Sequence, residues 1–175
     1  MSDELIFETA LVGKPKYLQA IGLLSVEIAH LERALAEMLA SIMGAHWLVA
    51  DAIFFASNSS IARMDIIARV APLVLASLPS ELKKVEAFLK RAKAVMGKRH
   101  DVVHAYWSLA ERGKHVDRMK LGGYSRKPVT LTELKTMVRD VQRLYSEIIR
   151  YNTTFQARHP KDIPSMAEYW PQQRW

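Results

Sequence analysis

The chain contains no cysteine among its 175 residues. This absence excludes disulfide bonds, thiolate metal sites and cysteine nucleophiles. Long hydrophobic runs are missing as well. The longest charge-free apolar stretch is residues 38–50, which are 13 residues long, whereas a helix needs about 18 or more apolar residues to cross a bilayer. We therefore expect no association with a membrane.

Basic residues are scarce at the start of the chain. Asp3, Glu4 and Glu8 stand where a secretory signal would have basic residues followed by an apolar stretch. We expect a soluble, cytoplasmic protein. Half of the residues are hydrophobic and a quarter are charged, which is typical of a chain that folds around a core. We expect one helical domain over residues 1–158 and a tail over residues 159–175, which holds three prolines and two tryptophans.

Positive charge is concentrated in one part of the sequence. The net charge is +7, yet residues 1–50 hold 3 basic and 6 acidic side chains, whereas residues 81–129 hold 13 basic and 5 acidic ones. A concentrated basic field attracts polyanions, and nucleic acid first. The alternative is a basic helix face that is simply solvated. The candidate RNA contacts in this segment are Lys98, Lys114, Arg118 and Lys120.

The spacing of apolar residues predicts helices along most of the chain. In residues 16–43 they recur alternately three and four positions apart, which places them on one helix face. A second helical segment begins in residues 47–57, and a third follows a break at residues 58–60. Thr130 and Glu133 form a capping box that opens a last helix. We expect an all-α antiparallel bundle of four to five helices.

Residues 108–129 lose this periodicity. Glycines and a proline interrupt the segment and charges dominate it, so we predict an irregular loop or a small hairpin.

Two helix boundaries earlier in the chain are predicted from single residues. Pro72 is expected to kink or end the third helix, and Ser80 is expected to cap the fourth.

Arg99 interrupts the apolar stripe of the fourth predicted helix. The stripe comprises Leu82, Val85, Leu89, Ala92, Met96, position 99, Val103 and Tyr106. A charged arginine in a buried position is costly unless it is paired. Three explanations are open: the helix ends before Arg99, an acidic side chain pairs with it, or the stripe opens into a polar pocket for an anion. Gly97 permits close approach of another helix, although a glycine inside a helix lowers the stability of that helix by about 1 kcal/mol relative to alanine.

Two histidines follow the arginine. His100 and His104 are four residues apart, which is metal-ligand spacing on a helix, but no third ligand is recognisable. Arg99 and His104 are five residues apart, or about 140° around an ideal helix axis. They therefore do not point at one target on a regular helix. A second copy of the chain, related by a two-fold axis, would bring the two groups together.

The sequence R-H-D-V-V-H at residues 99–104 resembles the R-x4–6-H signature of the HEPN superfamily of helical nucleotide-binding and ribonuclease domains. His100 takes the polar position that follows the arginine in that family. The apolar helix before the motif and the aromatic residues just after it are also similar. The resemblance in helical order covers roughly residues 16–155 and leaves out the tail.

The resemblance implies a homodimer in which two motifs face one another in a single cleft, with RNA as ligand. It implies cleavage of RNA without a metal or other cofactor. His104 would be the general acid–base, Arg99 would hold the phosphate and stabilise its growing charge, and His100 would orient the substrate or the other groups. Many members of the family only bind. The resemblance also suggests a toxin or defence role, with an antitoxin-like or other protein partner.

Two other interpretations stay open. In the first, the protein is a non-catalytic helical interaction module and Arg99 makes a structural ion pair. In the second, it is a metal-binding helical bundle that uses His100 and His104.

Overall fold

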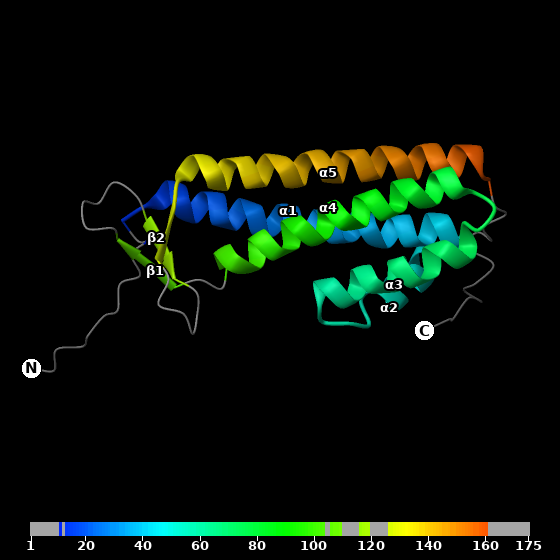
Figure 1. Cartoon of the computed structure of the whole chain (residues 1–175), viewed down its shortest axis with the longest axis horizontal. Helices are drawn as coiled ribbons and strands as arrows, with labels where there is room; N and C mark the ends of the chain where they lie inside the picture. The colour runs from blue at the N-terminus through cyan, green and yellow to red at the C-terminus, as the bar shows by residue number, and fades with distance from the viewer. Residues whose placement is uncertain (1–10, 12, 104–105, 110–115, 120–125, 161–175) are drawn as a thin grey trace, which may run out of the picture. The chain divides into compact units, whose positions relative to one another are not determined.

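The computed structural model describes residue 11 and residues 13–103, 106–109, 116–119 and 126–160. These contain five helices and three short strands (Figure 1). The helices are α1 (Pro15–Met43), α2 (Trp47–Phe54), α3 (Ser60–Val74), α4 (Pro79–Val103) and α5 (Leu131–Arg158). The strands are β1 (Tyr106–Leu109), β2 (Val116–Met119) and β3 (Arg126–Val129). The predicted all-α helical bundle is confirmed.

Several predicted helix boundaries are confirmed. α1 ends just before Gly44, whose φ of 59° is the left-handed conformation that commonly follows a helix. Ser59 caps α3 by accepting a hydrogen bond from the backbone N of Ala62 (3.5 Å). In the capping box, Thr130 Oγ1 accepts from Glu133 N (3.1 Å) and Glu133 Oε2 accepts from Thr130 N (2.7 Å). These bonds satisfy two backbone donors at the start of α5.

Two boundary predictions need correction. α4 begins at Pro79, so Ser80 is inside the helix and is not its cap. The fixed φ of proline suits the first helical position, where a backbone N–H is not required. The prediction for Pro72 is corrected in part: α3 continues to Val74, so Pro72 does not end the helix, and the kink at Pro72 stays a prediction.

The segment predicted as an irregular loop or small hairpin contains a three-stranded antiparallel sheet in the order β1-β2-β3. Trp107 is opposite Arg118 in the first pair of strands, and Asp117 is opposite Pro128 in the second. Proline has no N–H to give to a ladder, and its place in β3 agrees with the edge position of that strand. The hairpin prediction was therefore too small by one strand.

The described residues form two compact units, and α1, α4 and α5 contribute residues to both. The first unit comprises Met1–Ile28 and Val95–Gln142, so it contains the start of α1, the end of α4, the sheet and the start of α5. Its core consists of Leu11, Ala20, Leu24, Ile28, Met96, Val102, Trp107, Val129, Leu134, Val138 and Val141. The side chain of Arg99 lies within this unit.

The second unit comprises Ala29–Ala94 and Arg143–Trp175. Hydrogen bonds connect its helices: Asn152 Nδ2 donates to Ala34 O (3.1 Å), and Arg91 Nη2 donates to Glu147 Oε1 (3.0 Å). Its largest fully buried side chains are Leu31, Leu35, Met38, Leu39, Ile42, Phe54, Met64, Ile67, Leu75 and Phe155. Neither unit, as far as the structure describes it, has a helix long and apolar enough to cross a membrane.

Candidate functional site

The motif begins near the C-terminal end of α4. The helix continues to Val103, so Arg99 and His100 are both helical. The first explanation for Arg99, that the helix ends before it, is therefore wrong. His104 follows directly after the end of α4 and lies outside the described residues, so the structure does not place the second half of the motif.

The guanidinium of Arg99 has no ion-pair partner in the part of the chain that the structure describes. The side chain is half-buried, and its Nε is fully buried without a hydrogen-bond acceptor. A buried donor that lacks a partner costs about 1–3 kcal/mol. The proposed structural ion pair thus finds no partner among the described residues, and the buried Nε donor is left unsatisfied.

Arg99 lines a small pocket that also contains Asp140. The cavity measures about 10 Å³ and is lined by Leu24, Val95, Lys98, Arg99, Met137 and Asp140. This is about the space of one water molecule. It can receive a single atom of a ligand, such as a phosphate oxygen, and the rest of the ligand would remain outside. Asp140 is exposed and is the one carboxylate that lines this pocket.

The structure describes the side chains of only some of the other predicted site residues. Lys98 is exposed and shares the pocket with Arg99. His100 is also exposed. Arg118 is described only as a backbone position in β2, and Lys114 and Lys120 lie outside the described residues. The structure therefore brings together two of the seven candidates, Lys98 and Arg99.

Among the residues that the structure describes, no other helix makes a close contact at Gly97. Gly97 is exposed, and a Cβ built on it would have no heavy atom within 4 Å. Its surface is open to another molecule. As for a metal, the described residues contain no group of three or more histidine, aspartate or glutamate side chains that could hold one.

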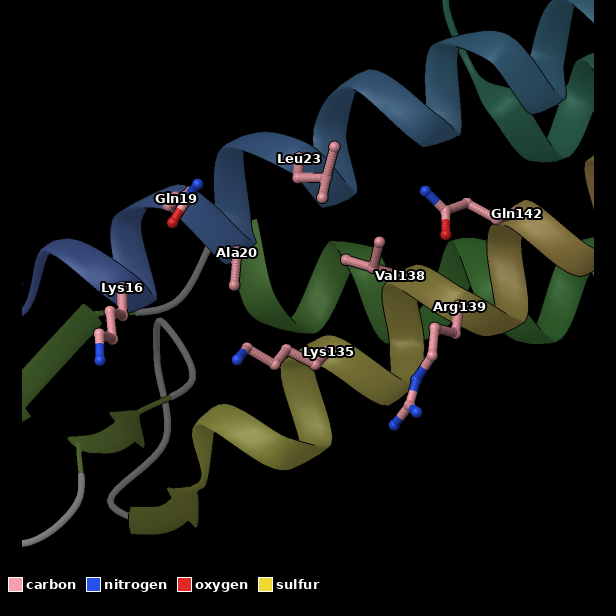
Figure 2. Close-up of a pocket in the computed structure, with 8 residues that line it drawn as sticks. All are labelled: Lys16, Gln19, Ala20, Leu23, Lys135, Val138, Arg139 and Gln142. Carbon is pink, nitrogen blue, oxygen red and sulfur yellow. The ribbon is translucent and has the colours of Figure 1, made fainter.

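A larger pocket lies on the opposite flank of α5. It has a volume of about 590 Å³ and lies between α1 and α5 in the first unit (Figure 2). We call it the α1–α5 groove. Its lining residues are Lys16, Gln19, Ala20 and Leu23 from α1, and Lys135, Val138, Arg139 and Gln142 from α5. Figure 2 shows Val138 directed toward α1, Lys135 extending toward the side of Lys16, and Arg139 pointing away from α1.

The groove is positively charged. Three of its eight lining residues are cationic and none is acidic. Lys16, Lys135 and Arg139 make no ion pair in the described part of the chain; Arg139 donates to Thr136 Oγ1 (3.1 Å). At one end, Gln142 Nε2 donates to Glu27 Oε1 (2.7 Å), which connects α5 to α1. The three cations thus retain charge for an anionic ligand.

Sequence reasoning missed this groove. Lys16 belongs to residues 1–50, which have more acidic than basic side chains, so a segment-by-segment count of charge hides it. The spacing of Lys135 and Arg139 was a usable signal, because residues four apart lie on the same face of a helix. Nothing in the sequence alone, however, indicated that Lys16 would line the same groove.

A second polar pocket lies in the second unit, but its charges are already paired. It has a volume of about 390 Å³. Arg33 forms ion pairs with Asp51 and, at 3.3 Å, with Glu37, and its guanidinium lies 5.2 Å from the ring centre of Trp47. The hydrogen bond to Asp51 raises the pKa of Arg33. These contacts hold α2 on α1 and are sufficient to explain the cluster as structural.

Comparisons with known proteins add no family to this description. No protein-family model, no curated protein and no solved structure significantly matches the chain.

Proposed function

We propose that this protein is a HEPN-like domain that binds RNA and cleaves it without a metal. The proposal depends chiefly on one observation: Arg99, in the motif, is half-buried on α4 and its Nε is buried without a partner. A guanidinium in this state supplies directed donors for a phosphate oxygen, and its planar fork suits that anion. The five helices of the described residues are compatible with the resemblance.

In the proposed reaction, Arg99 binds the phosphate and stabilises the negative charge that grows on it in the transition state. His104 acts as general acid–base at the 2′-hydroxyl or the leaving oxygen, since an imidazole titrates near neutral pH. His100 orients the substrate. Lys98 adds positive charge beside Arg99. A role in toxin or defence systems, with an antitoxin-like partner, is part of the same proposal.

The proposed active form is a homodimer. On a regular helix Arg99 and His104 would be about 140° apart, and in the family that the motif resembles a second copy brings such groups into one cleft. The structure describes α4 only as far as Val103 and does not place His104. The exposed surface at Gly97 is open to such a copy. In this arrangement the two motifs would meet near the end of α4.

Replacing Gly97 with alanine tests the position of the dimer seam. Alanine should stabilise α4 by up to about 1 kcal/mol, because nothing in the described chain obstructs the new methyl group. At a close seam the same methyl should weaken dimerisation. Gly22→Ala is a matched control, because Gly22 is also helical, exposed and unobstructed. Sedimentation measures the dimer, and equal dimerisation of both variants would place the seam elsewhere.

The RNA-binding part of the proposal is tested by salt dependence. RNA affinity should fall steeply as salt rises, since each phosphate contact releases a counterion. Replacing Lys114, Arg118 and Lys120 together with glutamine should weaken binding and flatten the slope of log affinity against log salt by about 2. Fluorescence anisotropy with a labelled single-stranded RNA measures both. An unchanged slope in the triple variant would remove these residues from the RNA contact surface.

One alternative has a specific observation in its favour. Asp140 lines the pocket of Arg99, so a change of rotamer could join the two side chains in a structural ion pair. The protein would then be a non-catalytic interaction module. The thermal stability of Arg99 variants separates the two functions.

A further inference from the structure

The α1–α5 groove has the chemistry of a ligand site that is separate from the motif. Its volume of about 590 Å³ lies within the range of roughly 300–1,000 Å³ that is usual for small-molecule sites. The lining also contains three aliphatic side chains, of which Ala20 and Val138 are almost fully buried and Leu23 is exposed. Leu23 is 43% exposed although it is a large apolar residue. The groove therefore offers both charge and uncovered hydrocarbon.

The absence of aromatic side chains from this lining argues against a nucleobase as the occupant. Proteins that hold single-stranded nucleic acid usually stack its bases on aromatic rings, and none of the eight residues of the groove is aromatic. An RNA backbone would use the cations but not the aliphatic surface. A ligand with an anionic head and a hydrocarbon chain uses both.

Two of the three cations of the groove stand near the start of a helix. Lys16 is the second residue of α1 and Lys135 is the fifth of α5. The N-terminal end of a helix carries a partial positive charge, so α1, which has no acidic residue in its first turn, adds to the attraction for an anion there. At the start of α5 the carboxylate of Glu133 offsets this charge. Ala20, Leu23 and Val138 follow further along the same helices, and they provide a path for a chain that leads away from the head.

We propose that the α1–α5 groove binds an amphiphilic anion: a phosphate or carboxylate head on an unbranched aliphatic chain. Lys16 and Lys135 hold the head, and Gln19 offers it a hydrogen-bonding amide. The chain lies on Ala20, Leu23 and Val138. This inference is independent of the proposed ribonuclease function, because it uses different residues on the opposite flank of α5.

The proposal is tested by calorimetric titration of the full chain with inorganic phosphate, hexyl phosphate and octyl phosphate. Each added methylene that becomes buried should tighten binding roughly threefold to fourfold, so octyl phosphate should bind roughly tenfold more tightly than hexyl phosphate. Inorganic phosphate should be the weakest of the three. Equal affinity for all three, or no binding, would overturn the proposal.

Variants locate the ligand in the groove. Lys16→Gln combined with Lys135→Gln should weaken octyl phosphate binding by about tenfold or more, which corresponds to loss of about one charge-assisted contact. Lys90→Gln is the control, because Lys90 is exposed on α4 and does not line the groove. Leu23→Ser should reduce the gain from chain length while phosphate binding remains. The midpoint of thermal unfolding of each variant should match that of the wild type. If the double lysine variant binds octyl phosphate as tightly as the wild type does, the assignment to this groove is overturned.

Two further arms identify the source and exclude a rival occupant. Sedimentation with vesicles that contain an anionic phospholipid distinguishes the two sources of such a ligand. Co-sedimentation indicates a membrane lipid, and its lack indicates a free amphiphile. Binding of octyl phosphate supports the proposed head-and-chain chemistry in either case. Labelled single-stranded RNA is then titrated with octyl phosphate. If octyl phosphate displaces the RNA, and if the double lysine variant no longer binds RNA, the groove is an RNA-binding site and the proposal is overturned.

Discussion

His104→Ala should lower RNA cleavage by about 10²–10⁴-fold, which is the usual contribution of general acid–base catalysis. The proposed imidazole transfers a proton at the 2′-hydroxyl or at the leaving oxygen, and alanine cannot. Folding and dimerisation should change little, because the role is chemical and not structural. Cleavage of a labelled RNA under single-turnover conditions measures the loss, with thermal melting and sedimentation as controls. Full activity in the variant would exclude His104 as the proton-transfer group.

The same assay separates this mechanism from a metal-dependent one. Cleavage by the wild-type chain should persist in excess EDTA, since Arg99 and His104 are proposed to act without a metal. Activity that disappears with EDTA and returns with zinc or manganese would instead favour the metal-binding alternative at His100 and His104.

Arg99→Ala should abolish cleavage and weaken RNA binding while the fold stays intact. The reason lies in the pocket: Arg99 has no carboxylate partner among the described residues, and its Nε is buried without an acceptor. Removing the side chain therefore breaks no ion pair that the structure describes. Cleavage rate, RNA affinity and the midpoint of thermal unfolding should be measured on one preparation.

The structural ion pair predicts a different result for the same variant. If Arg99 pairs with Asp140, its removal strands a carboxylate, and loss of a partner from a buried pair costs about 3–5 kcal/mol. Asp140 is exposed, so solvent would reduce that cost. Asp140→Asn distinguishes the two accounts. In the RNA-binding account it removes a repulsive charge beside the phosphate and binding tightens; in the ion-pair account it destabilises the fold as Arg99→Ala does.

The helices could be predicted from sequence because their signals are local. The capping box at Thr130 and Glu133 and the left-handed residue Gly44 act within one or two turns, so they do not depend on the rest of the chain. The sheet was harder to predict. Each of its strands has four residues, which is too short for alternation of polar and apolar residues to be convincing.

The candidate site was predicted in part. Arg99 was identified because a charge on an apolar stripe needs an explanation, and the structure removes one of the three explanations by extending α4 to Val103. The α1–α5 groove could not be predicted, because Lys16 and Lys135 are far apart in sequence and become neighbours only through packing of the two helices. Clusters that depend on tertiary structure are not visible in a count of charge by segment.

The central claim is that Arg99 is positioned to bind the phosphate of RNA. Its most direct test is the affinity of a labelled single-stranded RNA for wild type, Arg99→Gln and the control Arg69→Gln, an exposed arginine on α3, at low and at physiological salt. We predict binding that weakens with salt, at least a tenfold loss in Arg99→Gln, corresponding to about 1.4 kcal/mol, and little change in Arg69→Gln. Equal affinity of Arg99→Gln and wild type, or no RNA binding at low salt, would contradict the claim.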